Sequence, residues 1–124
     1  MSFLRKLLGR SGEDRAATHL AKIGYRVLER NYRTKMGEID LIALDRDMVV
    51  FVEVKTRTSD AYGAPELAVD VRKQRRMVKA ALTWLKQKKL HQMACRFDVV
   101  AISGGDDAQI EVIRDAFEID RTRL

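Results

Sequence analysis

The chain has few of the residues that build disulfides, zinc sites or membrane spans. Its one cysteine, Cys95, excludes an internal disulfide, and with only His19 and His91 beside it we expect no zinc cluster. No apolar run reaches the roughly 18 residues that a membrane span requires. The opening MSFLRKLLGR has neither the apolar core nor the cleavage site of a secretory signal. We therefore expect a cytoplasmic protein with no membrane partner.

Acidic residues are also in the minority. There are 18 Asp and Glu against 24 Lys and Arg, and the net charge of +6 favours a polyanionic partner. A chain of 124 residues is long enough for one domain with a real core and too short for two. We expect a basic N-terminal arm over residues 1–10 and a single domain over residues 11–124.

The centre of the expected fold is residues 37–57, GEIDLIALDRDMVVFVEVKTR. This stretch predicts two strands joined by a tight turn at Asp45-Arg46-Asp47. The second strand is β-branched and apolar until Glu53 and Lys55. This pattern is typical of a strand that is covered on both faces along most of its length and is no longer covered at its end. Because side chains alternate with a period of 2, Glu53 and Lys55 share one face.

The length of the turn decides whether Asp40 on the first strand meets Glu53 on the second. A loop of two residues, Arg46 and Asp47, or a loop of four pairs them directly, whereas a loop of three does not. If paired, their Cβ atoms would lie about 4.5–5.5 Å apart, close enough for both carboxylates to bind one hard divalent cation. Without a cation or a proton, the facing charges would destabilise the sheet. A metal site would resolve that conflict.

A helix is expected from Ser11, as its N-cap, to a stop at Gly24. Glu13 falls on the same stripe as the apolar residues of this helix. Two interpretations stay open. As a carboxylate in the first turn, Glu13 would gain about 0.3–1 kcal/mol from the helix dipole. Alternatively, it points at a cation held by Asp40 and Glu53.

A second, longer helix is expected from Val71 to Lys89. Residues 72–89 include eight basic residues and no acidic one, whereas a solvated helix face would usually carry compensating Glu at i, i+4 spacing. The helix is either a highly soluble exterior or, as we prefer, a track for phosphates. The residues expected to bind nucleic acid are Arg72, Lys73, Arg75, Arg76 and Lys79. Gln74 either reaches towards the site or bonds the backbone at the helix start.

The remaining segments complete the expected order. Residues 25–30 predict a first strand, and the basic connection 31–35 follows, in which Arg33 would contact phosphates and Tyr32 would stack on a base, unless both simply cover a loop. A loop is expected from Thr58 to Pro65.

Residues 96–102 and 110–113 predict the last two strands, with a turn at 104–107. Asp98 is either a further acidic ligand or, as we expect, paired with a basic neighbour or solvent-facing. The order is α-β-β-β-α-β-β, an α/β fold with a mixed sheet.

Asp40, a twelve-residue gap and Glu53-Val54-Lys55 resemble the PD-(D/E)xK nuclease signature. The longer wording, GEIDLIA followed by FVEVKTR, resembles the YraN-type family of small bacterial proteins, relatives of the archaeal Holliday-junction resolvases. The resemblance runs from about Gly12 to Phe117. Ile39 departs from the pattern, since it stands where the signature has proline.

The resemblance implies a restriction-endonuclease-like core and a metal-dependent endonuclease acting on branched DNA. It implies that Mg²⁺ or Mn²⁺ is bound by Glu13, Asp40, Glu53 and the carbonyl of Val54, and that Asp40, Glu53 and Lys55 are catalytic. Lys55 would need a strongly lowered pKa to act as a base, so we prefer that its charge stabilises the transition state.

Other functions remain open. The alternative from a different class is a non-catalytic nucleic-acid-binding or protein-interaction module on a nuclease-like scaffold. The sequence does not separate DNA from RNA. Junction specificity would most simply come from a twofold homodimer that presents two sites.

Overall fold

The computed structural model describes residues 3–57, 69–104 and 109–118. The order α-β-β-β-α-β-β is confirmed, and the fold is α/β with a mixed sheet. Its elements are α1 (Phe3–Lys22), β1 (Arg26–Arg33), β2 (Glu38–Asp45), β3 (Met48–Arg57), α2 (Val71–Gln87), β4 (Cys95–Ser103) and β5 (Gln109–Phe117). The expected loop from Thr58 to Pro65 and positions 105–107 of the expected turn lie outside the described residues.

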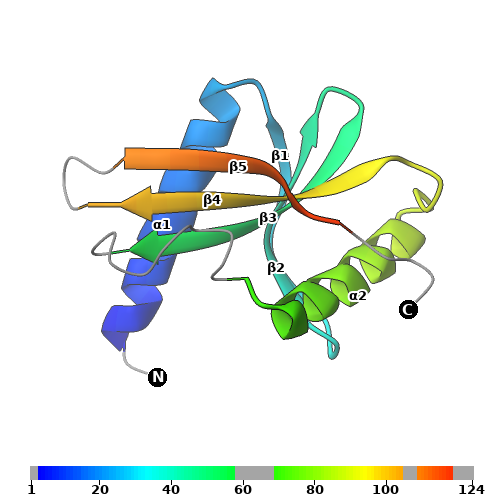
Figure 1. Cartoon of the computed structure of the whole chain (residues 1–124), viewed down its shortest axis with the longest axis horizontal. Coiled ribbons are helices and arrows are strands. Elements are labelled where there is room, and N and C mark those ends of the chain that lie inside the picture. The colour runs from blue at the N-terminus through cyan, green and yellow to red at the C-terminus, as the bar shows by residue number, and fades with distance from the viewer. Residues whose placement is uncertain (1–2, 58–68, 105–108, 119–124) are drawn as a thin grey trace.

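The five strands form one sheet in the order β1-β2-β3-β4-β5 (Figure 1). Neighbouring strands are antiparallel except β3 and β4, which are parallel. A parallel pair needs a crossover connection, and the connection from β3 to β4 carries α2. The strand β3 therefore lies in the middle of the sheet and is buried on both faces, as its apolar sequence predicts.

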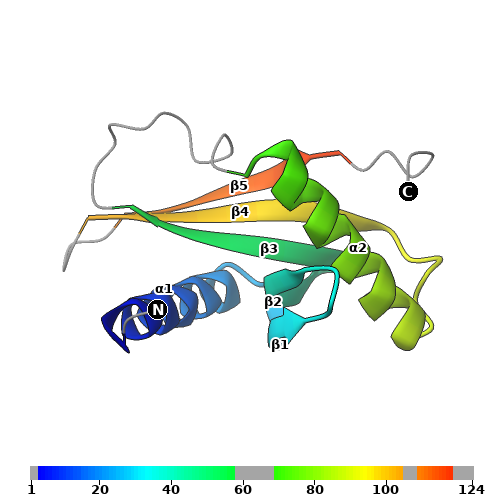
Figure 2. The ribbon, with the colours of Figure 1, turned by 90° about the horizontal axis from the view of Figure 1, so that it is seen from below.

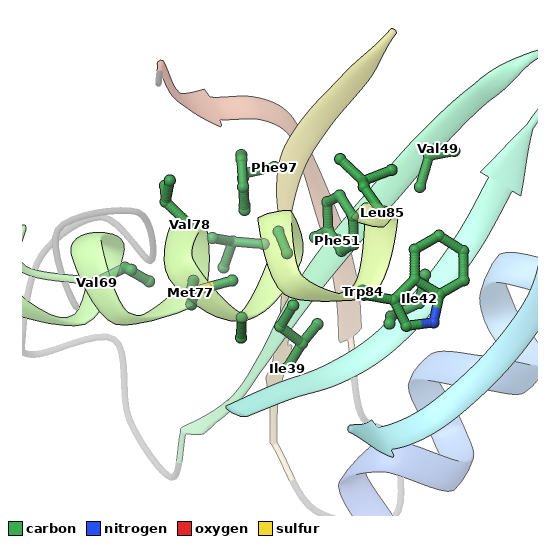
Figure 3. Close-up of a cluster of buried hydrophobic side chains, with 13 residues drawn as sticks. Ile39, Ile42, Val49, Phe51, Val69, Met77, Val78, Trp84, Leu85 and Phe97 are labelled. Atoms are coloured by element: carbon green, nitrogen blue, oxygen red, sulfur yellow. The ribbon is translucent and has the colours of Figure 1, made fainter. Parts of the chain in front are cut away.

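The two helices cover opposite faces of the sheet. In Figure 1 the helix α1 passes behind the strands, and in Figure 2, seen from below, α2 crosses in front of them. Under α2, Phe51 and Phe97 pack with Met77, Trp84 and Leu85 (Figure 3). Under α1, a second cluster contains Ala16, Leu20, Leu41, Val50 and Val52. Successive residues of β3 thus alternate between the two clusters, which fixes the face of every side chain that follows on that strand.

The N-terminal segment corrects the sequence analysis. Residues from Phe3 onwards are helical, so α1 begins before Ser11 and Ser11 is not its N-cap. Glycine inside a helix costs only about 1 kcal/mol, and Gly12 has a packing reason to be there. A Cβ on Gly12 would lie 2.6 Å from the Thr56 hydroxyl oxygen, so glycine lets α1 approach β3 closely. Because Glu13 lies mid-helix, its interpretation as a first-turn, dipole-stabilised carboxylate is wrong.

The strand β1 is longer than predicted. It continues to Arg33, so the segment expected as a connection is largely strand, with Asn31 at a positive φ of 53° and a register shift between Val27 and Glu29. The end of α1 agrees with prediction, since Gly24 has a φ of +100° and such residues commonly end helices. No helix in the described ranges is long and apolar enough to cross a membrane.

Candidate functional site

The β2–β3 hairpin brings the two predicted carboxylates together. Its turn has two residues, because Asp45 pairs with Met48. That register continues to Leu41 opposite Val52, and the next residues beyond this pair are Asp40 on β2 and Glu53 on β3, which interact with each other. At this point the carboxylate of Asp40 accepts a hydrogen bond from the Val54 backbone N–H at 2.8 Å. Asp40 is thus fixed to β3 by its side chain, beside Glu53.

The two carboxylates interact unfavourably. Glu53 is 4% exposed. Burial, and after it the negative charge of Glu53, raise the pKa of Asp40 from 3.8 to about 7. The Val54 N–H opposes that shift without cancelling it. A pair of like-charged oxygen donors, one buried and one half-buried, is an arrangement that a proton or a cation stabilises.

A lysine of α2 supplies positive charge to this pair. The ammonium group of Lys73 donates a hydrogen bond to Glu53 and forms an ion pair with it. Burial would lower the pKa of Lys73, but its hydrogen bond to Glu53 and the charges of Glu53 and Asp40 raise it. Lys73 is therefore held as a cation beside both carboxylates.

Lys73 points inwards to Glu53, whereas the sequence analysis named it only among the residues expected to bind nucleic acid. The signal was present in the sequence. Lys73 precedes Met77 by four residues and Ala80 by seven, the spacing of one helix face, and both are fully buried. Asp70 caps α2 by accepting the Lys73 backbone N–H at 2.8 Å, which sets this lysine in the first turn above Glu53.

Lys55 lies on the same side of the sheet as Glu53. It is two residues further along β3 and half-buried. Its side chain lies near enough to Lys73 to influence the pKa of that lysine. Two lysines therefore accompany the carboxylate pair, one from the strand as predicted and one from α2.

Glu13 approaches the pair from α1. Partial burial raises the pKa of Glu13, a hydrogen bond with Asn31 opposes this, and the charge of Asp40 raises it further. Glu13 and Asp40 therefore lie near each other. Within the described ranges, however, no three Asp, Glu, His or Cys side chains meet closely enough to hold a metal ion by themselves. The side chains brought together as one acidic pair are Asp40 and Glu53, with Glu13 beside Asp40.

A groove of about 760 Å³ lies between the β1–β2 turn and the first turns of α2. The turn is held by Thr34, whose hydroxyl accepts the backbone N–H groups of Met36 and Gly37, each at 3.1 Å. The charged residues lining the groove are Arg33, Lys35, Arg72, Lys73 and Arg76, against Glu38 and Asp70. The groove is thus predominantly basic, and through Lys73 it extends to the carboxylate pair.

The remaining residues expected to bind nucleic acid are placed differently. Arg75 and Lys79 are exposed but do not line the groove. Gln74 donates a hydrogen bond to the Val69 carbonyl at 2.9 Å, so its role at the helix start is confirmed. Tyr32 donates to the Gln87 side chain at 2.9 Å and packs against the α2 cluster, an arrangement that fits packing on α2 better than stacking on a base.

Asp98 lies on β4 opposite Val52 of β3, and its carboxylate belongs to a separate cluster of polar side chains. It is fully buried, and the Arg96 guanidinium donates to its two carboxylate oxygens at 2.9 and 3.1 Å. Arg96 also donates to Asp45 at 2.8 Å, and the Tyr25 hydroxyl donates to Asp98 at 2.9 Å. The expectation that Asp98 pairs with a basic neighbour is confirmed.

Comparison with known proteins assigns the family. The model of the family described as "Uncharacterised protein family UPF0102" matches residues 12–102, which span both carboxylates, both lysines and the whole of α2. The chain belongs to the UPF0102 family. The YraN-type resemblance is thereby confirmed.

Curated relatives match the UPF0102 chain over nearly its full length. A UPF0102 protein of Geotalea daltonii is 54% identical over 116 residues, covering 92% of this chain and 91% of the relative. One from Geobacter metallireducens is 51% identical over 120 residues, covering 96% and 98%. A third, from Rhodococcus opacus, is 49% identical over 112 residues, covering 89% and 95%. The fold described above therefore spans nearly the whole of these relatives.

Proposed function

We propose that this UPF0102 protein is a Mg²⁺- or Mn²⁺-dependent endonuclease that hydrolyses phosphodiester bonds in branched or structured DNA, within the PD-(D/E)xK superfamily that its sequence resembles. The observation that carries the proposal is the facing pair of Asp40 and Glu53, with Lys55 two residues further along the strand. Such a protein would work in the cytoplasm.

The donor set fits a hard divalent cation. Both carboxylates offer oxygen, the ligand that Mg²⁺ prefers, and the raised pKa of Asp40 reflects a negative charge that is only partly compensated. Asp40 and Glu53 would hold the cation, with Glu13 supporting Asp40 from α1 and with the Val54 carbonyl as the further ligand that the resemblance implies. When bound, such a cation withdraws charge from a phosphodiester and lowers the pKa of water.

The chain's own residues would supply the remaining chemistry. Lys55 would place its positive charge beside the phosphate as negative charge develops there, a role that needs no lowered pKa. The groove would hold the adjoining strand through Arg33, Lys35, Arg72 and Arg76, because phosphate contacts position a nucleic acid without reading its sequence. Branch selectivity is part of the proposal and would most simply come from a homodimer.

The test is a cleavage screen with Mn²⁺ or Mg²⁺ across junction, flap and linear DNAs, with RNA counterparts. Wild-type protein should cut branched DNA, and Glu53→Gln, Asp40→Asn and Lys55→Met should each reduce cleavage at least about a hundredfold, as expected for groups acting at the transition state. Asp47→Asn is the matched control, since it changes an exposed carboxylate in the same hairpin. Retained cleavage in any of the three variants would contradict the assignment.

A second candidate is favoured by one observation, the ion pair between Lys73 and Glu53. A carboxylate already neutralised by a lysine is what a non-catalytic, structural site contains. In that case the protein would bind nucleic acid in the groove and cleave nothing, and divalent cations would produce no heat of binding in a calorimeter.

A further inference from the structure

Lys73 belongs to two sites at once. Its ammonium group pairs with Glu53, and the same residue lines the basic groove between the β1–β2 turn and α2. Its side chain is 36% exposed, whereas that of Glu53 is 5% exposed. Lys73 is therefore the contact through which the groove and the carboxylate pair adjoin.

On the carboxylate side, Lys73 occupies the position of a counter-ion. A buried carboxylate without a compensating charge is strongly unfavourable, and Glu53 has Asp40 as a further negative neighbour. A divalent cation at the pair would give the same compensation. Lys73 and a cation therefore compete for Glu53.

On the groove side, Lys73 lies among basic neighbours. Arg72 and Arg76 line the same groove from α2, and a phosphodiester there would offer anionic oxygens to all three. A lysine has a flexible four-carbon stem and a compact charge, so it can exchange one anionic partner for another without movement of the helix. A phosphate in the groove is thus the natural second partner for this ammonium group.

We propose that Lys73 couples nucleic-acid binding to cation binding: a phosphate in the groove draws the ammonium group away from Glu53, and the freed carboxylate then takes the divalent cation. The proposal rests on the proposed function and adds its order of assembly. Lys73 is a positioning residue in this scheme, since it acts through Glu53. By linkage, the nucleic acid must raise cation affinity by the same factor as the cation raises nucleic-acid affinity.

Calorimetry at pH 8 tests the coupling without relying on cleavage. Ca²⁺, which also takes oxygen ligands, is titrated into wild-type protein, Lys73→Met, Lys73→Arg and Lys79→Met, with and without a short DNA duplex that is checked afterwards for integrity. Lys73→Met keeps the apolar stem and removes the competing charge. Lys79→Met removes a charge from the same helix outside the groove, and Lys73→Arg keeps the charge.

We expect DNA to tighten Ca²⁺ binding at least about fivefold in wild-type protein, within the usual range of coupling between sites. Lys73→Met should bind Ca²⁺ several-fold more tightly than wild type without DNA and gain little when DNA is added. Both other variants should behave as wild type. Lys73→Met binding Ca²⁺ no more tightly than wild type, or with the wild-type response to DNA, would overturn the proposal.

The wild-type protein provides a second measurement that needs no variant. The side-chain ¹⁵N resonance of Lys73, assigned from its absence in Lys73→Arg, should shift when DNA is added without a cation. An unchanged resonance would also overturn the coupling. If DNA and Ca²⁺ binding are coupled but no DNA is cleaved, the role proposed for Lys73 holds and only the proposed catalysis fails. The two failures are therefore distinguishable.

Discussion

Two groups of acidic side chains lie along the β2–β3 hairpin, one where Asp98 of β4 is joined to Asp45 through Arg96 and one at the open end of the hairpin, and the two ends are built differently. At the first, Asp98 of β4 meets a bidentate guanidinium from Arg96, the Tyr25 hydroxyl and the Asp115 backbone N–H at 3.0 Å. At the open end, Asp40 and Glu53 face each other with one ammonium group in contact. The first end is satisfied by the fold, whereas at the second, burial and the charge of Glu53 still raise the pKa of Asp40.

This difference separates a structural acid from a functional one. A buried carboxylate with a full set of donors stabilises the fold and has no need of a ligand. A carboxylate pair whose negative charge the fold does not fully neutralise is a candidate site for a ligand of opposite charge. Burial alone does not distinguish Asp98 from Glu53, but the identity of their neighbours does.

The largest effect is expected at the satisfied end. Asp98→Ala removes the fully buried partner of Arg96 and leaves the guanidinium with Asp45 alone, and breaking a buried pair in this way costs about 3–5 kcal/mol. Urea unfolding of the variant measures the loss. The control, Asp47→Ala, alters an exposed turn carboxylate and should stay within about 0.5 kcal/mol of wild type. A small loss for Asp98→Ala would mean that the two ends do not differ in their contribution to the fold.

At the open end, we expect removal of a carboxylate charge to stabilise the protein rather than destabilise it. The pKa of Asp40 is raised to about 7 in the folded protein, so between about pH 4 and 7 the folded state binds more protons than the unfolded state, and the free energy of unfolding falls as pH rises through this window. Asp40→Asn should flatten that slope and, at pH 8, stabilise the protein by about 2 kcal/mol. Urea unfolding from pH 4 to 8 measures both. An unchanged slope would show that the pair is already compensated.

Nucleic-acid binding should depend on the basic groove that adjoins the open end of the hairpin. Arg72→Glu with Arg76→Glu reverses two groove charges, and we expect at least about tenfold weaker DNA binding and a shallower dependence of affinity on salt. Arg75→Glu with Lys79→Glu makes the same charge change outside the groove and is the matched control. Fluorescence anisotropy from 50 to 200 mM salt, roughly the range in which such contacts weaken, compares them. Equal losses of affinity would mean that the whole basic face of α2, and not the groove alone, binds DNA.

The smallest effect on stability is expected from the hydroxyl group of Tyr25, one of the partners of Asp98. Tyr25→Phe removes one hydroxyl that donates to Asp98 and accepts from Arg96 at 2.6 Å and Arg114 at 2.9 Å. Because Asp98 keeps its guanidinium and backbone donors, we expect a loss of about 1 kcal/mol by urea unfolding. A loss as large as that of Asp98→Ala would make the hydroxyl, rather than the guanidinium, the main partner.

The sequence predicted most of the fold because its signals were local. The sequence left the length of the hairpin loop open, and the two-residue turn of the structure brings Asp40 beside Glu53 as one of the expected loop lengths required. The strand β3 is apolar because both of its faces are covered. The start of α1 was wrong because Ser11 followed by glycine favours a cap locally, whereas the close approach of Gly12 to Thr56 depends on tertiary packing. No local rule reports such a contact.

The candidate site was only partly predictable for the same reason. Strand alternation placed Lys55 on the face of Glu53, but the partner of Glu53 comes from α2, across the crossover connection. Lys73 was grouped with its basic neighbours by charge, while its spacing from Met77 predicted a buried face. The groove requires the β1–β2 turn and α2 to be adjacent, which is a property of the assembled sheet.

Gly37 stands where the β1–β2 turn comes closest to α2. A Cβ at this position would lie 2.5 Å from the Arg76 carbonyl oxygen, nearer than atoms of a folded chain tolerate, so any larger residue would push the turn outwards. The spacing between the two walls that carry Arg33 and Arg76 therefore depends on the absence of a single methyl group. A substitution here would change the width of the groove, and so the size of the anion that fits, while leaving every charge in place.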